Sequence, residues 1–506
     1  MFFLLIKPLR KRWAAFQAAK KNLVVPERGE GLVLQPFFNS PQSLNASEFT
    51  FLNLKSKFDD GNVDWNFSGY ALLWNYHLNY FDFLHQENLN VEAGLKLIHH
   101  FIDTTKICSH SFDPYPVSLR GVNWIKFLIK NNIDDSKIDE SLYRQYIKLS
   151  HEVEYHIGAN HLLENGFSLL FGAFYFHSEK LFQQAENILL KELKEQILTD
   201  GAHVELSTMY HRIILHRVLD CVNLMKNKRT ENNTLEELLK EKASAMLSWL
   251  DNMTFRSGEM PDFNDSAKDG VPSPAELNAY AKQLGVYADN IALNESGYRK
   301  LSFPKYEMIV DACNIMPSYN PGHTHSDMLS FCLNINDKQV IVDCGISTYE
   351  NNSRRKFERS TSAHNTVSIE GLEQSDMWAS FRVGKRARIL ERVAEENSFA
   401  STMIGFTSTG IAHKRLWTFL ADRIAITDYI LENHQHSSKA YLHFHPDARI
   451  EWNAGKISSD NFVIEFKNHN HLVLEDYDFA EGFNLLRKAK VAVISFSNLL
   501  DTEITL

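Results

Sequence analysis

The sequence predicts a multidomain α+β protein, in which a helical N-terminal domain precedes an all-β C-terminal domain of the antiparallel sandwich type. From about residue 65 to residue 250, apolar residues recur at three- and four-residue spacing, which indicates amphipathic helices. From Lys300 onward, short runs rich in β-branched and aromatic residues alternate with turn signals, which indicates strands. We therefore divide the 506 residues into an N-terminal segment 1–64, a helical domain 65–290 and a β domain 300–506.

The helical domain is expected to be an array of paired helices. Two clear amphipathic stretches are A-L-L-W-N-Y-H-L-N-Y-F-D-F-L-H at 71–85 and V-E-A-G-L-K-L-I-H-H-F-I at 91–102. Helices without intervening strands pack as a bundle, a solenoid or a closed toroid. No fixed repeat period decides among these three arrangements.

The β domain begins after a composition shift that places the boundary near residues 286–300. Its expected strands include Y-E-M-I-V-D at 306–311, L-S-F-C-L-N-I at 329–335, Q-V-I-V-D at 339–343 and N-T-V-S-I at 365–369. Histidines and carboxylates stand at the ends of these runs within 320–371. A rigid sheet would fix their geometry, so this stretch is well placed to form a site.

Composition limits the classes of partner. The chain carries 53 Lys and Arg against 63 Asp and Glu, a formal net charge of −10, so no domain-wide basic field exists to bind nucleic acid. An acidic ligand would need a local basic cleft. The 34 Phe, 18 Tyr and 8 Trp residues suit large cores and also sugar rings.

Signals for disulfides, secretion and membrane insertion are weak. The N-terminus, M-F-F-L-L-I-K-P-L-R-K-R-W, has a short apolar run followed by basic residues, the opposite order to a secretory signal. No stretch is long enough to span a bilayer, so a cytoplasmic location is the default. Residues 2–6 and the Lys/Arg cluster that follows could contact a membrane surface, but an ordinary helix or tail is the favoured interpretation of this segment. The cysteines are odd in number, form no C-x-x-C and are expected to be buried thiols: Cys108, Cys221, Cys313, Cys332 and Cys344.

Two constellations in the helical domain could carry chemistry. G-A-N-H-L-L-E-N-G holds Asn160 and His161, which could equally be a helix cap and a hydrogen-bonded histidine. D-G-A-H-V-E-L-S-T-M-Y-H-R at 200–212 holds Tyr210, which could equally be a core aromatic. Its other polar candidates are His203, Glu205, His211 and Arg212.

Two further stretches are expected to be loops that meet a ligand. M-P-D-F-N-D-S at 260–266 contains Asn264 and Asp265. In D-P-Y-P-V-S-L-R-G-V-N-W at 113–124, Arg120 could clamp a ligand carboxylate or an internal one. The same stretch contains Tyr115, Asn123 and Trp124.

In the β domain, His325, Asp343 and His364 form a candidate metal set, because zinc prefers histidine nitrogen and carboxylate oxygen. The competing interpretation is a satisfied hydrogen-bond network. A basic run lies between Asp343 and His364 and would usually be a solvated face; it consists of Arg354, Arg355, Lys356 and Arg359.

These residues together carry a resemblance. P-G-H-T-H-S-D-M-L-S-F at 321–331, V-D-C-G at 342–345 and R-S-T-S-A-H-N-T-V at 359–367 resemble the C-terminal signature of the heparinase II/III-like polysaccharide lyases. N-H-L-L at 160–163 and S-T-M-Y-H at 207–211 resemble that family's catalytic segments. W-N-Y-H-L-N-Y-F-D-F-L and P-Y-P-V-S-L-R-G-V-N-W resemble a subgroup tied to bacterial surface-polysaccharide gene clusters. The resemblance runs from about Trp65 to the end of the chain.

The resemblance implies an N-terminal (α/α) toroid joined to a C-terminal antiparallel β-sandwich, with the active site in the cleft between them. It also implies cleavage of a uronic-acid-containing acidic polysaccharide by β-elimination, which adds no water and leaves an unsaturated uronate. The C5 proton of a uronate is weakly acidic, so donors must first mask the carboxylate charge. A base then takes the C5 proton, and an acid protonates the leaving O4.

The resemblance also assigns roles to residues. Asn160, with His161 beside it, matches the position that binds the uronate carboxylate, and Tyr210 matches the tyrosine that serves as acid, or as both acid and base. His323 matches a histidine that faces the site from the β domain, and whether it or His161 is the base stays open. We expect the remaining substrate contacts from Tyr115, Arg120, Asn123, Trp124, His211, Asn264 and Arg359.

His325, Asp343 and His364 match positions that bind a structural zinc ion in some members of the family, and no organic cofactor is expected. Polysaccharide lyases usually act outside the cytoplasm, so a periplasmic or envelope location is the alternative to the default. A role in surface-polysaccharide production is equally open.

Two other functions remain as alternatives. The first is a glycoside hydrolase on an (α/α) scaffold, which would need two opposed carboxylates. Its candidates are Glu205, Asp262 and Asp265. The second is a non-catalytic glycan-binding or assembly protein that uses the same cleft.

Overall fold

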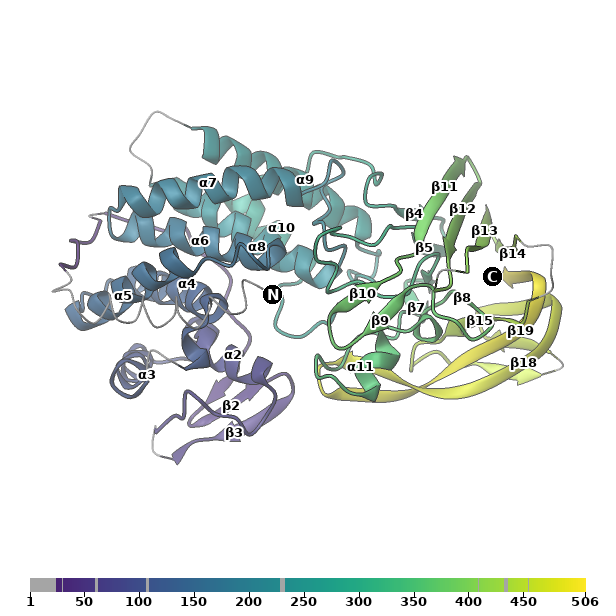
Figure 1. The fold of residues 1–506 in the computed structure, drawn as a ribbon, viewed down its shortest axis with the longest axis horizontal. Helices are drawn as coiled ribbons and strands as arrows, with labels where there is room; N and C mark the ends of the chain where they lie inside the picture. Colours follow the sequence, from purple (N-terminus) through teal and green to yellow (C-terminus); the bar gives the residue numbers. More distant parts are fainter. Residues whose placement is uncertain are drawn as a thin grey trace. The chain divides into compact units, whose positions relative to one another are not determined.

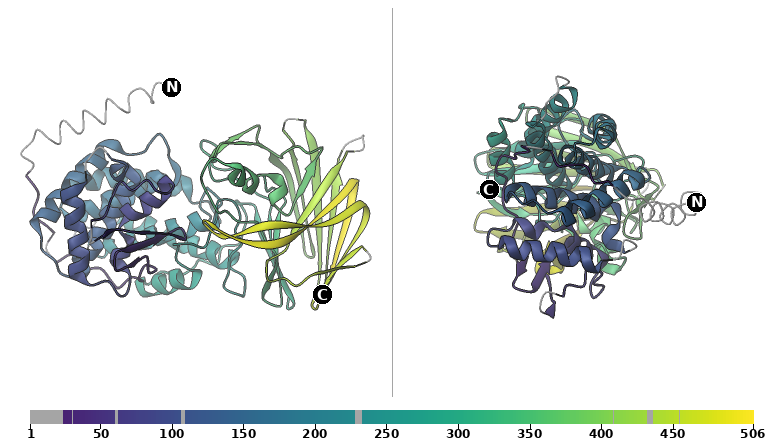
Figure 2. Two further views of the ribbon diagram at one scale, coloured as in Figure 1. Left: turned by 90° about the horizontal axis from the view of Figure 1, so that it is seen from below. Right: turned by 90° about the vertical axis from the view of Figure 1, so that its left-hand side faces the viewer.

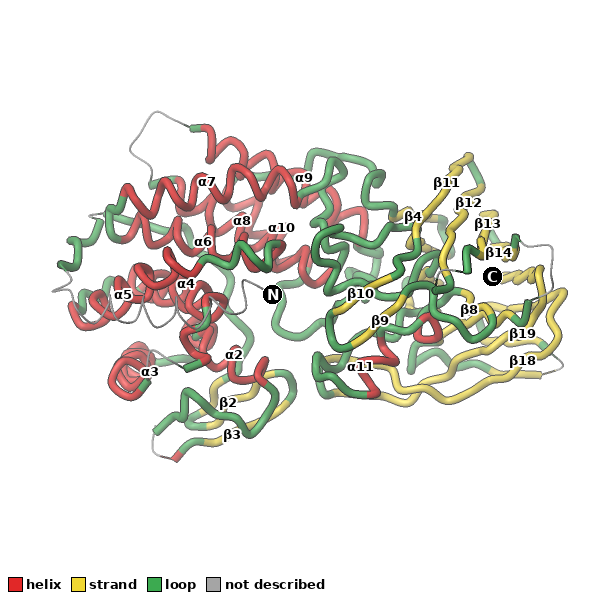
Figure 3. Tube along the Cα trace, viewed as in Figure 1, coloured by secondary structure: helices red, strands yellow, loops and turns green. Residues whose placement is uncertain are grey.

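The computed structural model describes residues 24–29, 31–59, 62–105, 109–227, 233–407, 409–431, 436–453 and 455–506. Residues 2–6 and Cys108, for which the sequence makes predictions, lie outside these ranges. Figure 1 shows the course of the chain, and Figure 3 separates its helices from its strands.

The chain forms two compact units, and neither is continuous in sequence. The first, the helical unit, comprises Met1–Gln196, Ile213–Ser244 and Glu276–Tyr287. The second, the β unit, comprises Ile197–Arg212, Ala245–Ala275 and Ala288–Leu506. A single boundary near residues 286–300 therefore describes the division incompletely, because the S-T-M-Y-H segment at 207–211 belongs to the β unit.

The helical unit begins with a small antiparallel sheet that the sequence did not predict, made of β1 (Leu44–Asn45), β2 (Glu48–Phe51) and β3 (Leu54–Lys57). The α-helices that follow are α2 (Leu72–Tyr80), α3 (Val91–Thr104), α4 (Pro114–Lys130), α5 (Ser136–Glu152), α6 (Ala159–Tyr175), α7 (Glu179–Gln196), α8 (Thr208–Met225), α9 (Thr234–Met253) and α10 (Pro274–Leu284). Short 3-10 turns stand before α3 and α4, as η2 (Asp82–His85) and η3 (His110–Phe112). The start of α8 and the end of α9 belong to the β unit.

The helices of this unit differ in how much of their surface is buried. In α4 and α6 nearly every residue is buried, so both are inner helices. In α3, α5 and α7 the buried residues recur at helical spacing along one face, as Gly94, Ile98 and Phe101 do in α3, so these are outer helices. Inner helices paired with outer ones are the organisation of an (α/α) toroid.

The stretch 113–124, expected to be a loop, is the start of the inner helix α4. Its two prolines, Pro114 and Pro116, lie in the first turn, where backbone N–H groups have no partner within the helix and proline is tolerated. The prolines in this stretch therefore mark a helix start.

Arg120, Asn123 and Trp124, which were expected to contact substrate, are all buried among the helices of this unit. Arg120 donates from Nη1 to the Asn79 carbonyl oxygen at 3.0 Å and from Nε to Gln145 at 2.8 Å. Asn123 donates to the Tyr80 carbonyl oxygen at 2.9 Å, and the Trp124 ring packs against aromatic neighbours. These side chains hold the inner helix in place.

The β unit contains two large antiparallel sheets. The four-stranded sheet consists of β4 (Tyr298–Ser302), β5 (Tyr306–Asp311), β6 (Phe331–Ile335) and β7 (Lys338–Ile341), which confirms the runs expected at 306–343. The ten-stranded sheet consists of β8 (Val367–Ile369), β11 (Arg388–Glu395), β12 (Ser398–Gly405), β13 (Ile411–Leu420), β14 (Arg423–Ile430), β15 (Ser438–His443), β16 (Glu451–Asn453), β17 (Lys456–Ser459), β18 (Phe462–Gly482) and β19 (Leu485–Thr505).

One hydrophobic core joins the two sheets, so the predicted antiparallel sandwich is confirmed. Inward residues of the smaller sheet, such as Met308 and Phe331, pack in the same cluster as Trp417 and Ile494 of the larger one. The long hairpin of β18 and β19 runs along the larger sheet and is yellow in Figure 2. Between β7 and β8 in sequence lie the helix α11 (Ser353–Glu358) and the turn η4 (Thr361–Ala363). Between β8 and β11 lies a separate hairpin of β9 (Asp376–Trp378) and β10 (Arg382–Gly384).

The sequence also makes predictions about the cysteines and about membrane-spanning segments. The four cysteines within them are free and buried, as predicted: Cys221, Cys313, Cys332 and Cys344. No helix in the described ranges has the length and apolar character needed to cross a membrane.

Candidate functional site

In the β unit, the start of α8 is fixed to the loop at 261–267. Ser207 caps the helix, because its Oγ accepts a hydrogen bond from the backbone N–H of Tyr210 at 3.2 Å. The same hydroxyl donates to the backbone oxygen of Asp265 at 2.7 Å. The cap therefore sets where Tyr210 projects relative to this loop.

The loop at 261–267 is in turn joined to the loop at 312–330, which connects β5 to β6. The backbone N–H of Asp265 donates to the His323 carbonyl oxygen at 3.0 Å, and the backbone N–H of His325 donates to Asn264 Oδ1 at 3.0 Å. Three segments far apart in sequence thus meet within one unit.

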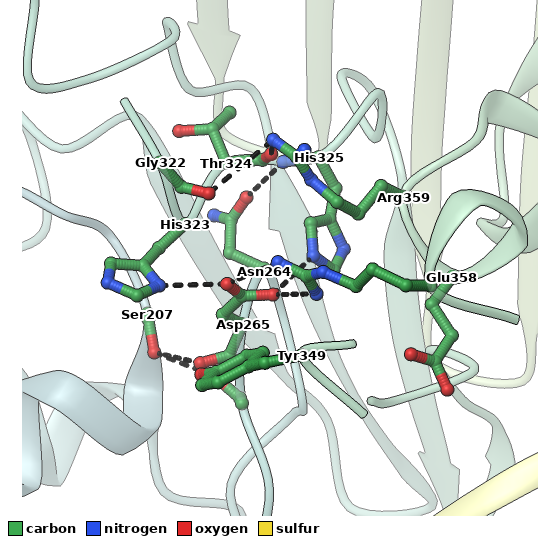
Figure 4. Close-up of polar contacts among 12 residues, drawn as sticks. Ser207, Asn264, Asp265, Gly322, His323, Thr324, His325, Tyr349, Glu358 and Arg359 are labelled. Carbon is green, nitrogen blue, oxygen red and sulfur yellow. Dashed lines mark hydrogen bonds and ion pairs between the residues drawn. The ribbon is translucent and has the colours of Figure 1, made fainter. Parts of the chain in front are cut away.

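The carboxylate of Asp265 is the centre of this arrangement (Figure 4). It accepts hydrogen bonds from His323 Nδ1 at 2.8 Å, from His325 Nε2 at 2.8 Å and from Arg355 Nη2 at 2.7 Å, and Arg355 Nη1 also contacts it. Burial would raise the pKa of Asp265, but Arg355 and the two histidine hydrogen bonds hold it well below its usual range. The side chain is therefore an ionised carboxylate.

An ionised carboxylate only accepts hydrogen bonds, so the ring nitrogen of each histidine that faces Asp265 carries a proton. For His323 this nitrogen is Nδ1, so the uncharged form of the ring has its lone pair on Nε2. His325 carries its proton on Nε2 and keeps the Nδ1 lone pair. One carboxylate thereby gives the two histidines different free nitrogens.

Two tyrosines lie beside His323. The Tyr210 ring lies 4.1 Å from the His323 ring, centroid to centroid, and its hydroxyl is 3.3 Å from the hydroxyl of Tyr349. Burial raises the pKa of both phenols well above the usual value, so both are neutral proton donors at neutral pH. The site therefore pairs a proton acceptor, His323 Nε2, with proton donors.

Two residues expected to contact substrate are buried and support this site. Arg359 is buried and donates to the carbonyl oxygens of Thr324 at 3.0 Å and Gly322 at 3.4 Å, which holds the His323 loop. Asn264 is buried between Leu206 and His325, to which it is hydrogen-bonded. Arg359 and Asn264, expected to contact substrate, are thus bonded within the protein in this structure.

The same correction applies to His211. Its ring is buried, contacts the Met246 carbonyl oxygen through Nε2 at 3.0 Å and lies 4.2 Å from the Trp249 ring. Burial lowers the pKa of His211 to about 3, so it is neutral. It belongs to the packing beneath α8.

A group of buried side chains next to the His323 loop could hold a metal ion. His325, Asp327 and His364 each offer a ligand atom, and these atoms lie within 4.8 Å of one another. Among the described residues, His325 Nδ1, Asp327 Oδ2 and His364 Nε2 have no hydrogen-bond partner. Buried polar atoms normally have partners, so three unpartnered atoms in one small group fit a bound cation.

The expected ligand Asp343 has a different place. Its Oδ2 accepts a hydrogen bond from His364 Nδ1 at 2.7 Å, which turns His364 Nε2 toward the group, and Asp327 stands where Asp343 was expected. Each histidine of the group therefore donates a hydrogen bond from its other ring nitrogen to a carboxylate, His325 to Asp265 and His364 to Asp343. This is the usual support of metal-binding histidines.

The charge around this group also suits a cation. Burial raises the pKa of Asp327 well above its usual range, and the neighbouring Asp311 raises it further. Burial would lower the pKa of His364, but Asp343, Asp327 and Asp311 raise it to about 9. Buried carboxylates thus outnumber their cationic partners here, and a positive ion would restore the balance.

The helical unit holds the other predicted catalytic residues. Asn160 and His161 lie in the first turn of α6. The helix begins after Gly158, the N-cap residue, which has a positive φ of 68°. His161 Nδ1 lies 3.2 Å from Glu154 Oε2, and the His161 ring lies 4.5 Å from the Tyr115 ring. The structure therefore groups His161 with Tyr115, and it groups Tyr210 with His323 in the other unit.

The sequence assigns no role in these groups to Glu154, Arg355, Tyr349 or Asp327, and it does not predict the central position of Asp265. Asp327 stood in the quoted motif H-T-H-S-D, two residues after His325, which was the available signal. Tyr349 follows V-D-C-G in a segment without a recognised pattern. The roles of Asp265 and Arg355 depend on contacts across 90 positions of sequence.

The hydrolase alternative loses one of its candidates. Asp265 is fully buried, and its two oxygens are held by Arg355 and two histidines. A general acid must carry a proton that it can give to the substrate, and this carboxylate has none.

Known families match both parts of the chain. Heparinase II/III N-terminus matches residues 117–294, and Heparinase II/III-like, C-terminal matches residues 287–504. No curated protein sequence matches the chain.

Solved structures agree with the fold. A heparinase III structure is 15% identical with a TM-score of 0.70 and covers 88% of this chain and 80% of its own. A mutant of the heparan sulfate lyase HepC from Pedobacter heparinus is 14% identical with a TM-score of 0.60, covering 98% and 87%. A chondroitinase AC lyase is 11% identical with a TM-score of 0.53, covering 88% and 78%. These likenesses confirm the toroid followed by the sandwich.

The Asp265 arrangement predicts a strong effect of one arginine. Changing Arg355 to Met leaves a buried carboxylate without its guanidinium and should lower the free energy of unfolding by about 3–5 kcal/mol. The matched control is Lys356→Met on the same helix, whose side chain is exposed and whose loss should cost less than about 0.5 kcal/mol. Denaturant unfolding of the β unit measures both, and equal stability of the two variants would contradict the arrangement.

Proposed function

Because the chain belongs to the heparinase II/III-like family, we propose that it is a polysaccharide lyase that cleaves a uronic-acid-containing acidic polysaccharide by β-elimination. The observation that carries this proposal is the Asp265–His323 pair beside Tyr210. It supplies a proton acceptor and a neutral phenol in one site, which are the two groups that an elimination needs. The lyases of similar fold, named for heparan sulfate and chondroitin, support the substrate class.

In the proposed reaction, His323 Nε2 takes the C5 proton of the uronate. The electrons of the C5–H bond form the C4–C5 double bond as the C4–O4 bond breaks. The Tyr210 hydroxyl gives its proton to the leaving O4, and the Tyr349 hydroxyl at 3.3 Å stabilises the resulting phenolate. The proton then returns from His323 to Tyr210, so the enzyme is restored without water entering the product.

The uronate carboxylate must be neutralised before the C5 proton can leave. We assign this step to Asn160 and His161, as the family resemblance implies. Both residues lie in the first turn of α6, and the His161 side chain is 32% exposed, which supports the assignment.

We further propose that the metal of this family site is zinc, held by His325 Nδ1, Asp327 and His364 Nε2. When bound, the ion supplies a cross-link between the His323 loop and the start of β8. Its partner His325 also binds Asp265, so the same link steadies the carboxylate that orients His323. Elimination transfers only protons and needs no organic cofactor.

The setting is also a proposal. The segments at 74–84 and 114–124 resemble the subgroup tied to surface-polysaccharide gene clusters, so we propose a surface polysaccharide as substrate and the periplasm or envelope as the place of action.

If Tyr210 is the acid, removal of its hydroxyl group should slow the reaction strongly. Tyr210→Phe should lower kcat/KM by about 10²–10⁴-fold, because the ring stays and only the proton donor is lost. Ultraviolet absorbance of the unsaturated uronate follows the reaction on heparan sulfate, chondroitin sulfate and alginate. Tyr287→Phe, at an exposed tyrosine, is the control and should keep full activity. Activity of Tyr210→Phe equal to this control would reject the assignment.

The corrected ligand set predicts how metal content responds. The purified protein should contain about one zinc ion per chain; Asp327→Ala should lose it, and Asp343→Asn should bind it about 10–100-fold more weakly. Elemental analysis and chelator competition measure this. Retained zinc in Asp327→Ala together with complete loss in Asp343→Asn would restore Asp343 as the ligand.

A further inference from the structure

The β9–β10 hairpin has one face packed on the β unit and one face in water. Its strands pair Trp378 with Arg382 and Met377 with Val383. Directly paired residues project from the same face, so Trp378 and Arg382 share one face and Met377 and Val383 share the other. Val383 packs against the sandwich core, whereas Trp378 is 53% exposed. The hairpin therefore presents an indole and a guanidinium side by side to solvent.

The exposed indole has a defined position. A methyl group placed on Gly384 would lie 2.9 Å from the Trp378 ring, so the ring lies across the glycine, two residues from Arg382 on the same face. One side of the indole is thus supported by the hairpin backbone. A supported aromatic face open to water suits the apolar face of a sugar ring.

Phe381, at the tip of the hairpin, connects this face to the catalytic rings. Its ring lies 5.7 Å from the His323 ring and 5.2 Å from the Tyr349 ring, and it is 39% exposed. Arg382 is the next residue. The exposed face of the hairpin therefore begins where the proposed reaction site ends.

The hairpin is anchored by the arginines that build the reaction site. Arg355, which holds Asp265, also donates from Nε to the Ser380 carbonyl oxygen at 3.1 Å. Arg359, which holds the His323 loop, contacts the Arg382 carbonyl oxygen at 3.4 Å. Arg355 and Arg359 thus hold both the turn of the hairpin and the loop of the proposed base His323, which fixes the distance between them.

The charge of this segment is opposite to that of the chain. Residues 376–388 contain four basic residues and one acidic residue, whereas the whole chain has a net charge of −10. Lys385 pairs with Asp376 at 3.5 Å, and within the described ranges Arg382 and Arg388 have no carboxylate partner. An exposed cationic segment on an acidic protein attracts anions to that place.

We propose that the β9–β10 hairpin is a sugar-binding subsite that holds an anionic sugar residue adjoining the one that is cleaved. Trp378 stacks against the sugar ring, and Arg382 binds its carboxylate or sulfate group with charge-assisted hydrogen bonds. This inference rests on the proposed function, since it takes the acidic polysaccharide as its ligand. It adds affinity for a long chain, and the chemistry stays with Tyr210 and His323.

The test uses full-length protein and separates binding from turnover. In a Tyr210→Phe background, binding of heparan sulfate, chondroitin sulfate and alginate is measured by calorimetry for the parent, for Trp378→Ala/Arg382→Ala and for a control, Trp452→Ala/Arg449→Ala. Trp452 is 48% exposed, so the control removes an exposed tryptophan and an exposed arginine from another place in the β unit. All substituted side chains are at the surface, and thermal unfolding confirms that each variant folds.

We expect the hairpin variant to bind its best polysaccharide at least about 10-fold more weakly than the parent, a difference of about 1.4 kcal/mol, and the control to match the parent. With Tyr210 intact, the same hairpin changes should raise KM while kcat stays within about twofold. Equal binding by the hairpin and control variants, or no binding by the parent, would overturn the inference. Hairpin-dependent binding without any unsaturated product from the unaltered protein would instead reject the lyase function and leave the subsite standing.

Discussion

The buried carboxylate of Asp265 is the interaction on which the rest of the site depends. It accepts hydrogen bonds from His323 and His325 and a bidentate contact from Arg355, and its own backbone is tied to Ser207. A buried charge is costly unless every lone pair is used, and here cationic and histidine donors use them. Because these partners come from three different segments of the chain, Asp265 positions the proposed base, a histidine of the candidate metal group and the start of α8 together.

The contacts of Asp265 also explain why the Tyr210 segment belongs to the β unit. The segment that carries Tyr210 lies within the helical half of the sequence, yet it folds with the sandwich because Ser207 and Asp265 join it there. The proposed acid and base therefore lie in one compact unit. Arg355 also donates to the turn of the β9–β10 hairpin, so the proposed reaction site and the proposed sugar subsite share this arginine.

Periodicity and family motifs predicted much of this from sequence, since the strands at 306–311 and 331–335 and the pairing of His325 with His364 are all found. Local pattern could not show that the prolines before Arg120 open an inner helix, or which carboxylate faces the metal group. That choice depends on the hydrogen bond between Asp343 and His364, which only the folded sheet creates. Tyr349 had no local signal, because its role comes from a contact with Tyr210.

The most direct measurement of the central claim is the protonation of two imidazole rings. Nitrogen NMR of histidine-labelled protein at mildly alkaline pH, assigned with His323→Gln and His325→Gln, reports which ring nitrogen carries the proton. We predict a proton on Nδ1 of His323 and on Nε2 of His325, and we expect Asp265→Asn to remove this preference at both rings. A proton on Nε2 of His323 in the unaltered protein would contradict this prediction, because no lone pair would then be available to remove the substrate proton.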